Sequence, residues 1–229
     1  MTFTTGYIAT TAGDVSKISD HKDTTQKQEF KLDSVINTRH ELISLQQNSI
    51  AHQGQAAEQQ LERKETPNVD SSGEIRITNS HEPEWHVTDF WAVSRPDSDD
   101  LIVVKNSGGT FAFDLIADAI GMNIKRIRFD LHQILADFDG HWVGGFDERS
   151  GRVESGLLYG EDIENDVEMG DPFKRTSNKS VIGPKIDYNG DSLKLKIGRD
   201  GWVQVVSPGT YPQEAYLNFV NDVMLSYAR

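Results

Sequence analysis

Small and branched apolar residues recur at seven-residue intervals in the first third of the chain, at Ile36, Ile43, Ile50 and Ala57. The segment 14–66 that contains them has no proline, is rich in Gln, Glu, Lys and Asp, and includes Gly54 as its one glycine. A heptad row of this kind is the pattern of a coiled-coil seam. We therefore expect residues 14–66 to form a long helical stalk that oligomerises.

The second row of the expected seam is mostly polar, so the apolar clamp is short and is best defined between residues 32 and 50. Val35 and Leu42 flank the first row and widen the apolar stripe, which favours more than two strands and, among these, a trimer. Two alternatives stay open: a helix packed on its own domain, and a largely disordered arm. The expected oligomerisation residues are Leu32, Val35, Ile36, Arg39, Leu42, Ile43, Gln46, Ile50, Gln53, Ala57 and Gln60.

The pattern changes after Pro67, where short β-type runs separated by turn residues replace the helical spacing. We interpret 67–73 as a linker and 74–229 as an acidic β-rich head. Residues 1–13 precede the stalk and are either an N-terminal docking segment or a frayed end. The predicted fold class is α+β, with an N-terminal long helix, a mainly antiparallel β-rich domain and a C-terminal amphipathic helix.

Within the head, the local signals differ in strength. Asn189-Gly190 and Asp200-Gly201 separate alternating runs and predict a three-stranded meander over 181–206. Pro212 opens the final amphipathic helix. Further strands are expected at 75–78, 86–93, 101–104, 110–113, 127–131 and 153–159, with a hairpin turn at 106–109, a short helix over 114–122 and a loop over 160–180.

Composition limits the kinds of partner. The formal net charge is −13, and residues 67–229 hold 27 acidic and 16 basic side chains, so binding to a phosphate backbone is disfavoured. There are no cysteines, which excludes disulfides and thiolate metal sites. No basic and apolar leader opens the chain, and no apolar run approaches the ~20 residues that span a bilayer. We expect a soluble protein without a signal peptide or cofactor.

One group of side chains is a candidate ligand site. Trp142 lies beside Asp139 and His141 at a predicted hairpin, with Asp147 nearby, and an aromatic ring with carboxylates can bind a sugar. The sequence 187–192 fails the calcium-loop pattern, because Gly198 stands where the bidentate glutamate belongs. The acidic run 161–171 is interpreted as a solvated loop, and no metal site or catalytic residue is predicted.

These observations favour a non-enzymatic structural or attachment subunit of a larger assembly, such as a virion fibre, collar or tail component. Its expected partners are further copies of itself, other structural proteins of the assembly and a surface glycan. Two alternatives remain: a carbohydrate-binding or carbohydrate-active, glycosidase-like protein, and an intracellular adaptor with a partner-binding helix.

Overall fold

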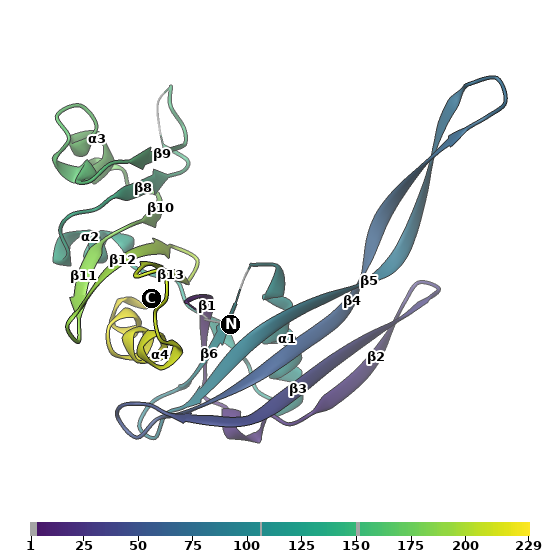
Figure 1. Ribbon diagram of the computed structural model, residues 1–229, viewed down its shortest axis with the longest axis horizontal. Helices are drawn as coiled ribbons and strands as arrows, with labels where there is room; N and C mark the ends of the chain where they lie inside the picture. The colour runs from purple at the N-terminus through teal and green to yellow at the C-terminus, as the bar shows by residue number, and fades with distance from the viewer. Residues whose placement is uncertain (1–3, 106, 150–151) are drawn as a thin grey trace.

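The computed structural model describes residues 4–105, 107–149 and 152–229, which form one large curled sheet flanked by short helices (Figure 1). Antiparallel pairing links the described strands in the order β2-β3-β4-β5-β6-β1-β13-β12-β10-β8-β9, while β11 pairs with β12 and β7 with β1. The strands are β1 (Thr5–Thr11), β2 (His21–Lys27), β3 (Phe30–Ser44), β4 (Ile50–Val69), β5 (Ile75–Ser94), β6 (Asp100–Val104), β7 (Lys125–Arg126), β8 (Val143–Phe146), β9 (Gly156–Tyr159), β10 (Lys179–Ile182), β11 (Lys185–Tyr188), β12 (Asp191–Gly198) and β13 (Trp202–Ser207). The α-helices are α1 (Phe111–Ile120), α2 (Leu131–Asp137), α3 (Gly170–Arg175) and α4 (Gln213–Asp222).

The predicted N-terminal long helix and coiled-coil stalk are wrong. Residues 14–66 contain β2, β3 and most of β4, and their described part has no α-helix. The run 56–65 is rich in good helix formers, but helix propensity is a weak preference that tertiary pairing overrides. Here β4 pairs with β5 over its whole length, from Ile50 opposite Ser94 to Val69 opposite Ile75.

The expected seam residues therefore lie on several strand faces. Leu32 and Ile36 are buried, whereas Leu42 and Ile50 are exposed. The polar members make local contacts: Gln53 Oε1 accepts a hydrogen bond from Arg39, and Gln60 Nε2 donates to Glu58. The expected linker 67–73 is the end of β4 and the turn that leads to β5.

Residues 5–11 of the expected docking segment form β1, which lies between β6 and β13 in the middle of the sheet. Residues 1–3 of that segment lie outside the described residues. Because β1 joins the strands on its two sides, the beginning and the end of the chain belong to one sheet. Tyr7 pairs with Val104 on one side and with Trp202 on the other.

Two hydrophobic cores lie on opposite faces of the sheet. Phe90 and Ala92 of β5 point into a core beneath α1, whereas Trp91 and Val93 point into a larger core beneath α2, α3 and α4. A strand that is buried on two faces needs apolar residues at consecutive positions. This explains the continuous runs at 90–93 and 101–104.

Several predictions for the head hold. The meander is present as β11, β12 and β13, with Asn189 and Gly190 at positive φ in the first turn. The final helix is present as α4.

Other predictions for the head are wrong. The strand predicted at 110–113 is instead the start of α1. Of the predicted hairpin turn 106–109, residues 107–109 form a 3-10 turn and Asn106 lies outside the described residues. The loop predicted at 160–180 includes α3. The strand predicted at 127–131 is absent: Phe129 forms only an isolated bridge with Ala228, and Leu131 begins α2.

Candidate functional site

A long two-stranded hairpin projects from the sheet and is called here the arm, residues 57–87 of β4 and β5 (Figure 1). Among the described strands, β3 pairs with β4 only as far as Glu58, and β6 pairs with β5 only from Phe90 onwards. Every residue from 62 to 82 is exposed. The outer half of the arm thus has neither a third strand nor a core of its own.

The two faces of the arm differ in chemistry. Directly opposite residues of antiparallel strands share a face, and successive residues alternate between faces. One face carries the pairs Val69–Ile75, Pro67–Ile77, Leu61–Pro83, Gln59–Trp85 and Ala57–Val87, interrupted by Glu65–Asn79 and Arg63–His81. The other face carries Asn68–Arg76, Thr66–Thr78, Lys64–Ser80, Glu62–Glu82 and Gln60–Glu84. The arm is therefore amphipathic, with one apolar and one polar face.

The apolar side chains of the arm are open to solvent. Val69, Ile75, Ile77, Trp85 and Val87 have exposed fractions between 49% and 68%. The polar face, by contrast, is held by local pairs, such as the ion pair of Lys64 with Glu82 at 2.9 Å. Clustered exposed apolar residues on a protein surface indicate a contact with another molecule.

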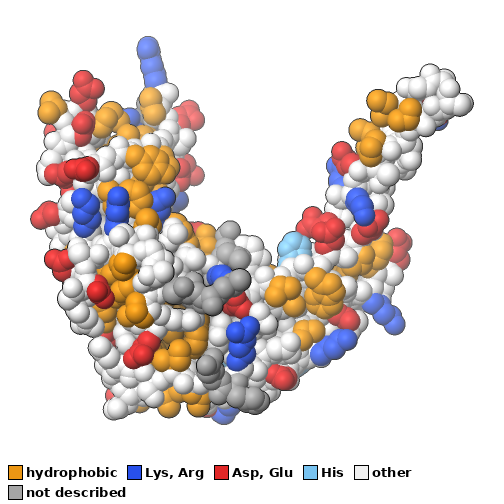
Figure 2. All heavy atoms as spheres, in the orientation of Figure 1, with side chains coloured by type: hydrophobic (Ala, Val, Ile, Leu, Met, Phe, Trp, Pro, Cys, Tyr) orange, Lys and Arg blue, Asp and Glu red, His pale blue; other side chains and the backbone are white. Residues whose placement is uncertain are grey.

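A second uncovered surface lies on the lobe formed by β8, β9, β10 and β12. Lys194 Nζ lies 4.1 Å from the ring centroid of Trp142, and Lys196 Nζ lies 5.2 Å from that ring and 5.6 Å from the ring of Tyr159. Lys185 pairs directly with Lys194 and so projects on the same face. We call Trp142, Leu157, Tyr159, Lys185, Lys194 and Lys196 the lysine–aromatic face. Figure 2 shows basic and apolar side chains next to each other on this lobe, across from the arm.

Of the four residues predicted to bind a glycan, Asp139, His141 and Trp142 stay adjacent, but His141 is buried and Asp147 lies apart. His141 is fully buried; its backbone N–H donates to the carboxylate of Glu164, and its Nε2 lies 2.9 Å from the carbonyl oxygen of Phe138. Burial lowers the pKa of His141. Trp142 is half-buried and donates Nε1–H to the carbonyl of Leu195. Asp139 is exposed beside His141 and Trp142. Asp147 follows β8, so the extended chain between Trp142 and Asp147 is roughly 16 Å long.

The acidic run 161–171 has a structural role at Glu164. This carboxylate is buried and accepts hydrogen bonds from the backbone N–H groups of Gly140 and His141. Asp166 accepts bonds from the backbone N–H groups of Glu168 and Met169. Within the described residues, no group of three His, Asp or Glu side chains is placed to hold a metal ion.

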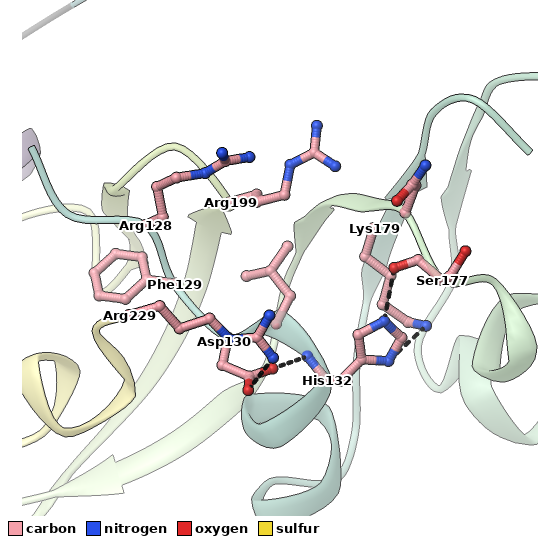
Figure 3. Close-up of a pocket in the computed structure, with 10 residues that line it drawn as sticks. Arg128, Phe129, Asp130, His132, Ser177, Lys179, Arg199 and Arg229 are labelled. Atoms are coloured by element: carbon pink, nitrogen blue, oxygen red, sulfur yellow. Dashed lines mark hydrogen bonds and ion pairs between the residues drawn. The ribbon is translucent and has the colours of Figure 1, made fainter.

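A cleft of about 500 Å³ is lined largely by basic residues (Figure 3). These residues come from four separate segments of the chain, so the sequence did not predict the cleft. Lys179, at its side, is 1% exposed. Its Nζ donates to the carbonyl oxygens of Thr176 at 2.7 Å and Lys174 at 3.0 Å, and lies 3.5 Å from Nδ1 of His132. Burial lowers the pKa of Lys179 to about 8.

The lowered pKa of Lys179 predicts a pH dependence of stability. In the unfolded chain the amine regains its ordinary pKa of 10.5, so between pH 8 and 10.5 the unfolded state binds more protons than the folded state. Lys179 should therefore make the free energy of unfolding rise with pH in this window, by at most about 1.4 kcal/mol per pH unit. Urea unfolding of the wild type and Lys179→Met at several pH values measures this slope. An equal slope in the two proteins would contradict it.

The chain matches no protein-family model, and comparison with curated proteins and with solved structures gives no match either. In the part of the chain that the structure describes, no helix is long and apolar enough to cross a membrane. The functional argument therefore depends on the geometry of the arm and of the two surfaces described above.

Proposed function

We propose that the protein is a structural subunit of a larger assembly of copies of itself, in which the arm of one copy packs on the lysine–aromatic face of the next. The observation that carries this proposal is the apolar face of the arm. An isolated two-stranded hairpin is at best marginally stable in water. A partner that covers Val69, Ile75 and Ile77 would supply the burial that the outer half of the arm lacks within its own chain.

The prolines of the arm favour contact through its face over contact through its edges. Both strands are sheet edges in the outer half, and each contains one proline, Pro67 in β4 and Pro83 in β5. Proline has no backbone N–H, and on edge strands it discourages the addition of a further strand. The partner should therefore lie across the apolar face and bury its side chains.

Charge and side-chain chemistry favour a second copy of this chain as the partner. The arm holds seven acidic and three basic side chains, so it is both apolar and acidic. The lysine–aromatic face offers two aromatic rings, the apolar stems of three lysines and their ammonium groups. In a chain with a net charge of −13, such a basic and aromatic surface is the complement of the arm.

The proposed contact joins two different surfaces and is therefore heterologous. Contacts of this kind produce rings when the rotation between copies closes, and helical filaments when it does not. Collars and tails of virus particles are assemblies of these shapes, and this is the kind of assembly that we propose. In this proposal the arm, and not a coiled coil, makes the contact between copies.

Reversing the charge of the receiving face should prevent the assembly. In Lys194→Glu/Lys196→Glu the acidic arm meets two carboxylates instead of two ammonium groups, and we expect at least tenfold weaker self-association, measured by sedimentation velocity. Lys27→Glu/Lys31→Glu is the matched control, since it makes the same change of charge on exposed residues of the β2–β3 hairpin. Equal effects of the two variants would contradict the proposal and indicate a general charge effect.

A further inference from the structure

The basic cleft is built from segments that are distant in the sequence and fixed to one another by backbone hydrogen bonds. Phe129 N–H donates to Arg199 O at 3.0 Å, and Arg229 N–H donates to Arg128 O at 2.8 Å. The chain before α2, the turn between β12 and β13, and residue 229 therefore meet at one place. The fourth segment, 177–179, closes the cleft through the contact of Ser177 O with Nε2 of His132 at 2.8 Å.

The side chains of the cleft carry an excess of positive charge. Four cationic groups, Arg128, Lys179, Arg199 and Arg229, share the lining with one acidic side chain, Asp130. Arg229 forms an ion pair with Asp130, and this pairing lowers the pKa of that carboxyl. The guanidinium groups of Arg128 and Arg199 form no ion pair within 4.0 Å in the described part of the chain. Figure 3 shows these two groups extending on the same side of the cleft.

The buried amine of Lys179 adds to this field. Its Nζ donates to two carbonyl oxygens and lies near Nδ1 of His132. In the described residues it forms no ion pair with a carboxylate within 4.0 Å. A buried cation without a carboxylate partner is costly. An anion in the cleft would offset that cost. Arginines that are fully solvated carry no such cost, so the buried Lys179 is the stronger indication of an anion site.

We propose that this cleft binds a small phosphate-bearing molecule, with Arg128 and Arg199 as the groups that contact the phosphate. Guanidinium groups donate two parallel N–H bonds to phosphate oxygens, and a doubly charged phosphate matches the surplus charge better than a single carboxylate does. A volume of about 500 Å³ is in the range of small-molecule sites. The inference is independent of the proposed assembly, because the cleft shares no residue with the arm or the lysine–aromatic face.

Isothermal titration of the full chain with inorganic phosphate and pyrophosphate, at constant ionic strength, tests this inference. We expect saturable binding with a Kd of about 1 mM or below, and weaker binding of acetate. Arg128→Gln/Arg199→Gln should reduce the affinity at least ~10-fold, since each arginine loses its charge-assisted hydrogen bonds. Arg128 is exposed and Arg199 half-buried, so the double variant keeps the core intact.

Lys27→Gln/Lys31→Gln is the matched control, because it removes the same charge from exposed residues of the β2–β3 hairpin, outside the cleft and both proposed contact surfaces, and should leave phosphate binding unchanged. The inference is overturned by any of three results: no saturable binding of phosphate or pyrophosphate, equal affinity in the wild type and Arg128→Gln/Arg199→Gln, or acetate bound as tightly as phosphate. Each of these results can occur whether or not the protein self-associates, so this test is separate from the test of assembly.

Discussion

Ile75→Asp combined with Ile77→Asp is expected to leave the protein monomeric, with a mass of 25.7 kDa in light scattering. The two residues are exposed on the apolar face near the tip of the arm and contribute no core contact within the chain. Two new carboxylates there would have to be desolvated in the proposed contact, which costs several kcal/mol. The wild type should instead have a mass that is a multiple of one chain and that rises with concentration.

The matched control uses the other face of the same strand. Thr78→Asp/Ser80→Asp adds the same two charges on β5, but on the polar face, where Arg76 and Lys64 lie. This variant should assemble like the wild type. A monomeric wild type, or loss of assembly in both variants, would contradict the role of the apolar face, and hydrogen exchange over residues 62–82 would show whether the arm itself stays paired.

Gly54→Val is expected to destabilise the fold by ~3 kcal/mol, which lowers Tm by roughly 6–12 °C for a chain of this size. Gly54 pairs directly with Phe90, whose ring lies over the glycine, so that a Cβ at position 54 would lie 2.1 Å from Cζ of Phe90. Phe90 is fully buried beneath α1, in the cluster that includes Phe113 and Ile116. The high strand propensity of valine does not compensate for this overlap.

Ala57→Val is the control for this prediction, because it adds methyl groups three positions along the same strand on the half-exposed opposite face. We expect a change in Tm within a few degrees there. A small effect of Gly54→Val in thermal unfolding would show that Phe90 can adopt another rotamer at low cost. A glycine in the interior of a helix is merely unfavourable. In the sheet, Gly54 is required because the ring of Phe90 occupies the space of a side chain.

The seven-residue spacing was misleading because it is a coincidence of the sequence and has no counterpart in the sheet. Ile36 and Ile43 lie in β3 on either side of a register shift, and Ile50 and Ala57 lie in β4. A spacing of seven is odd, so within a regular strand it alternates between the two faces, and no row results. The helix-forming composition of 56–65 reinforced the error, since the partner strand β5 begins only at Ile75 and long-range pairing is invisible to a local pattern.

Local signals were more reliable where the turn chemistry is specific. The Asn189-Gly190 turn and the amphipathic pattern after Pro212 predicted β11, β12 and α4, because their information lies within a few residues. Pro67 was interpreted as the end of a helix, yet it is a strand residue opposite Ile77. Alternation of Val69, Ile75 and Ile77 with polar neighbours was the signal that could have identified the amphipathic arm.

The candidate sites could be predicted only in part, for the same reason. Trp142 was identified from its neighbours in sequence, but its actual ring contacts are Lys194, Lys196 and Tyr159, which come from other strands. The residues of the basic cleft are up to 101 positions apart, from Arg128 to Arg229. Only the folded sheet brings them together.

Site-specific cross-linking between copies tests the proposed contact most directly, since the chain has no cysteine of its own. One preparation carries Ile77→Cys and the other Lys196→Cys, and the two are mixed in equal amounts and treated with a short bismaleimide. The arm-to-face contact predicts a covalent dimer that contains one chain of each kind, and little dimer when Ser80→Cys on the polar face replaces Ile77→Cys. Equal cross-linking from Ile77→Cys and Ser80→Cys, or none from either, would contradict it.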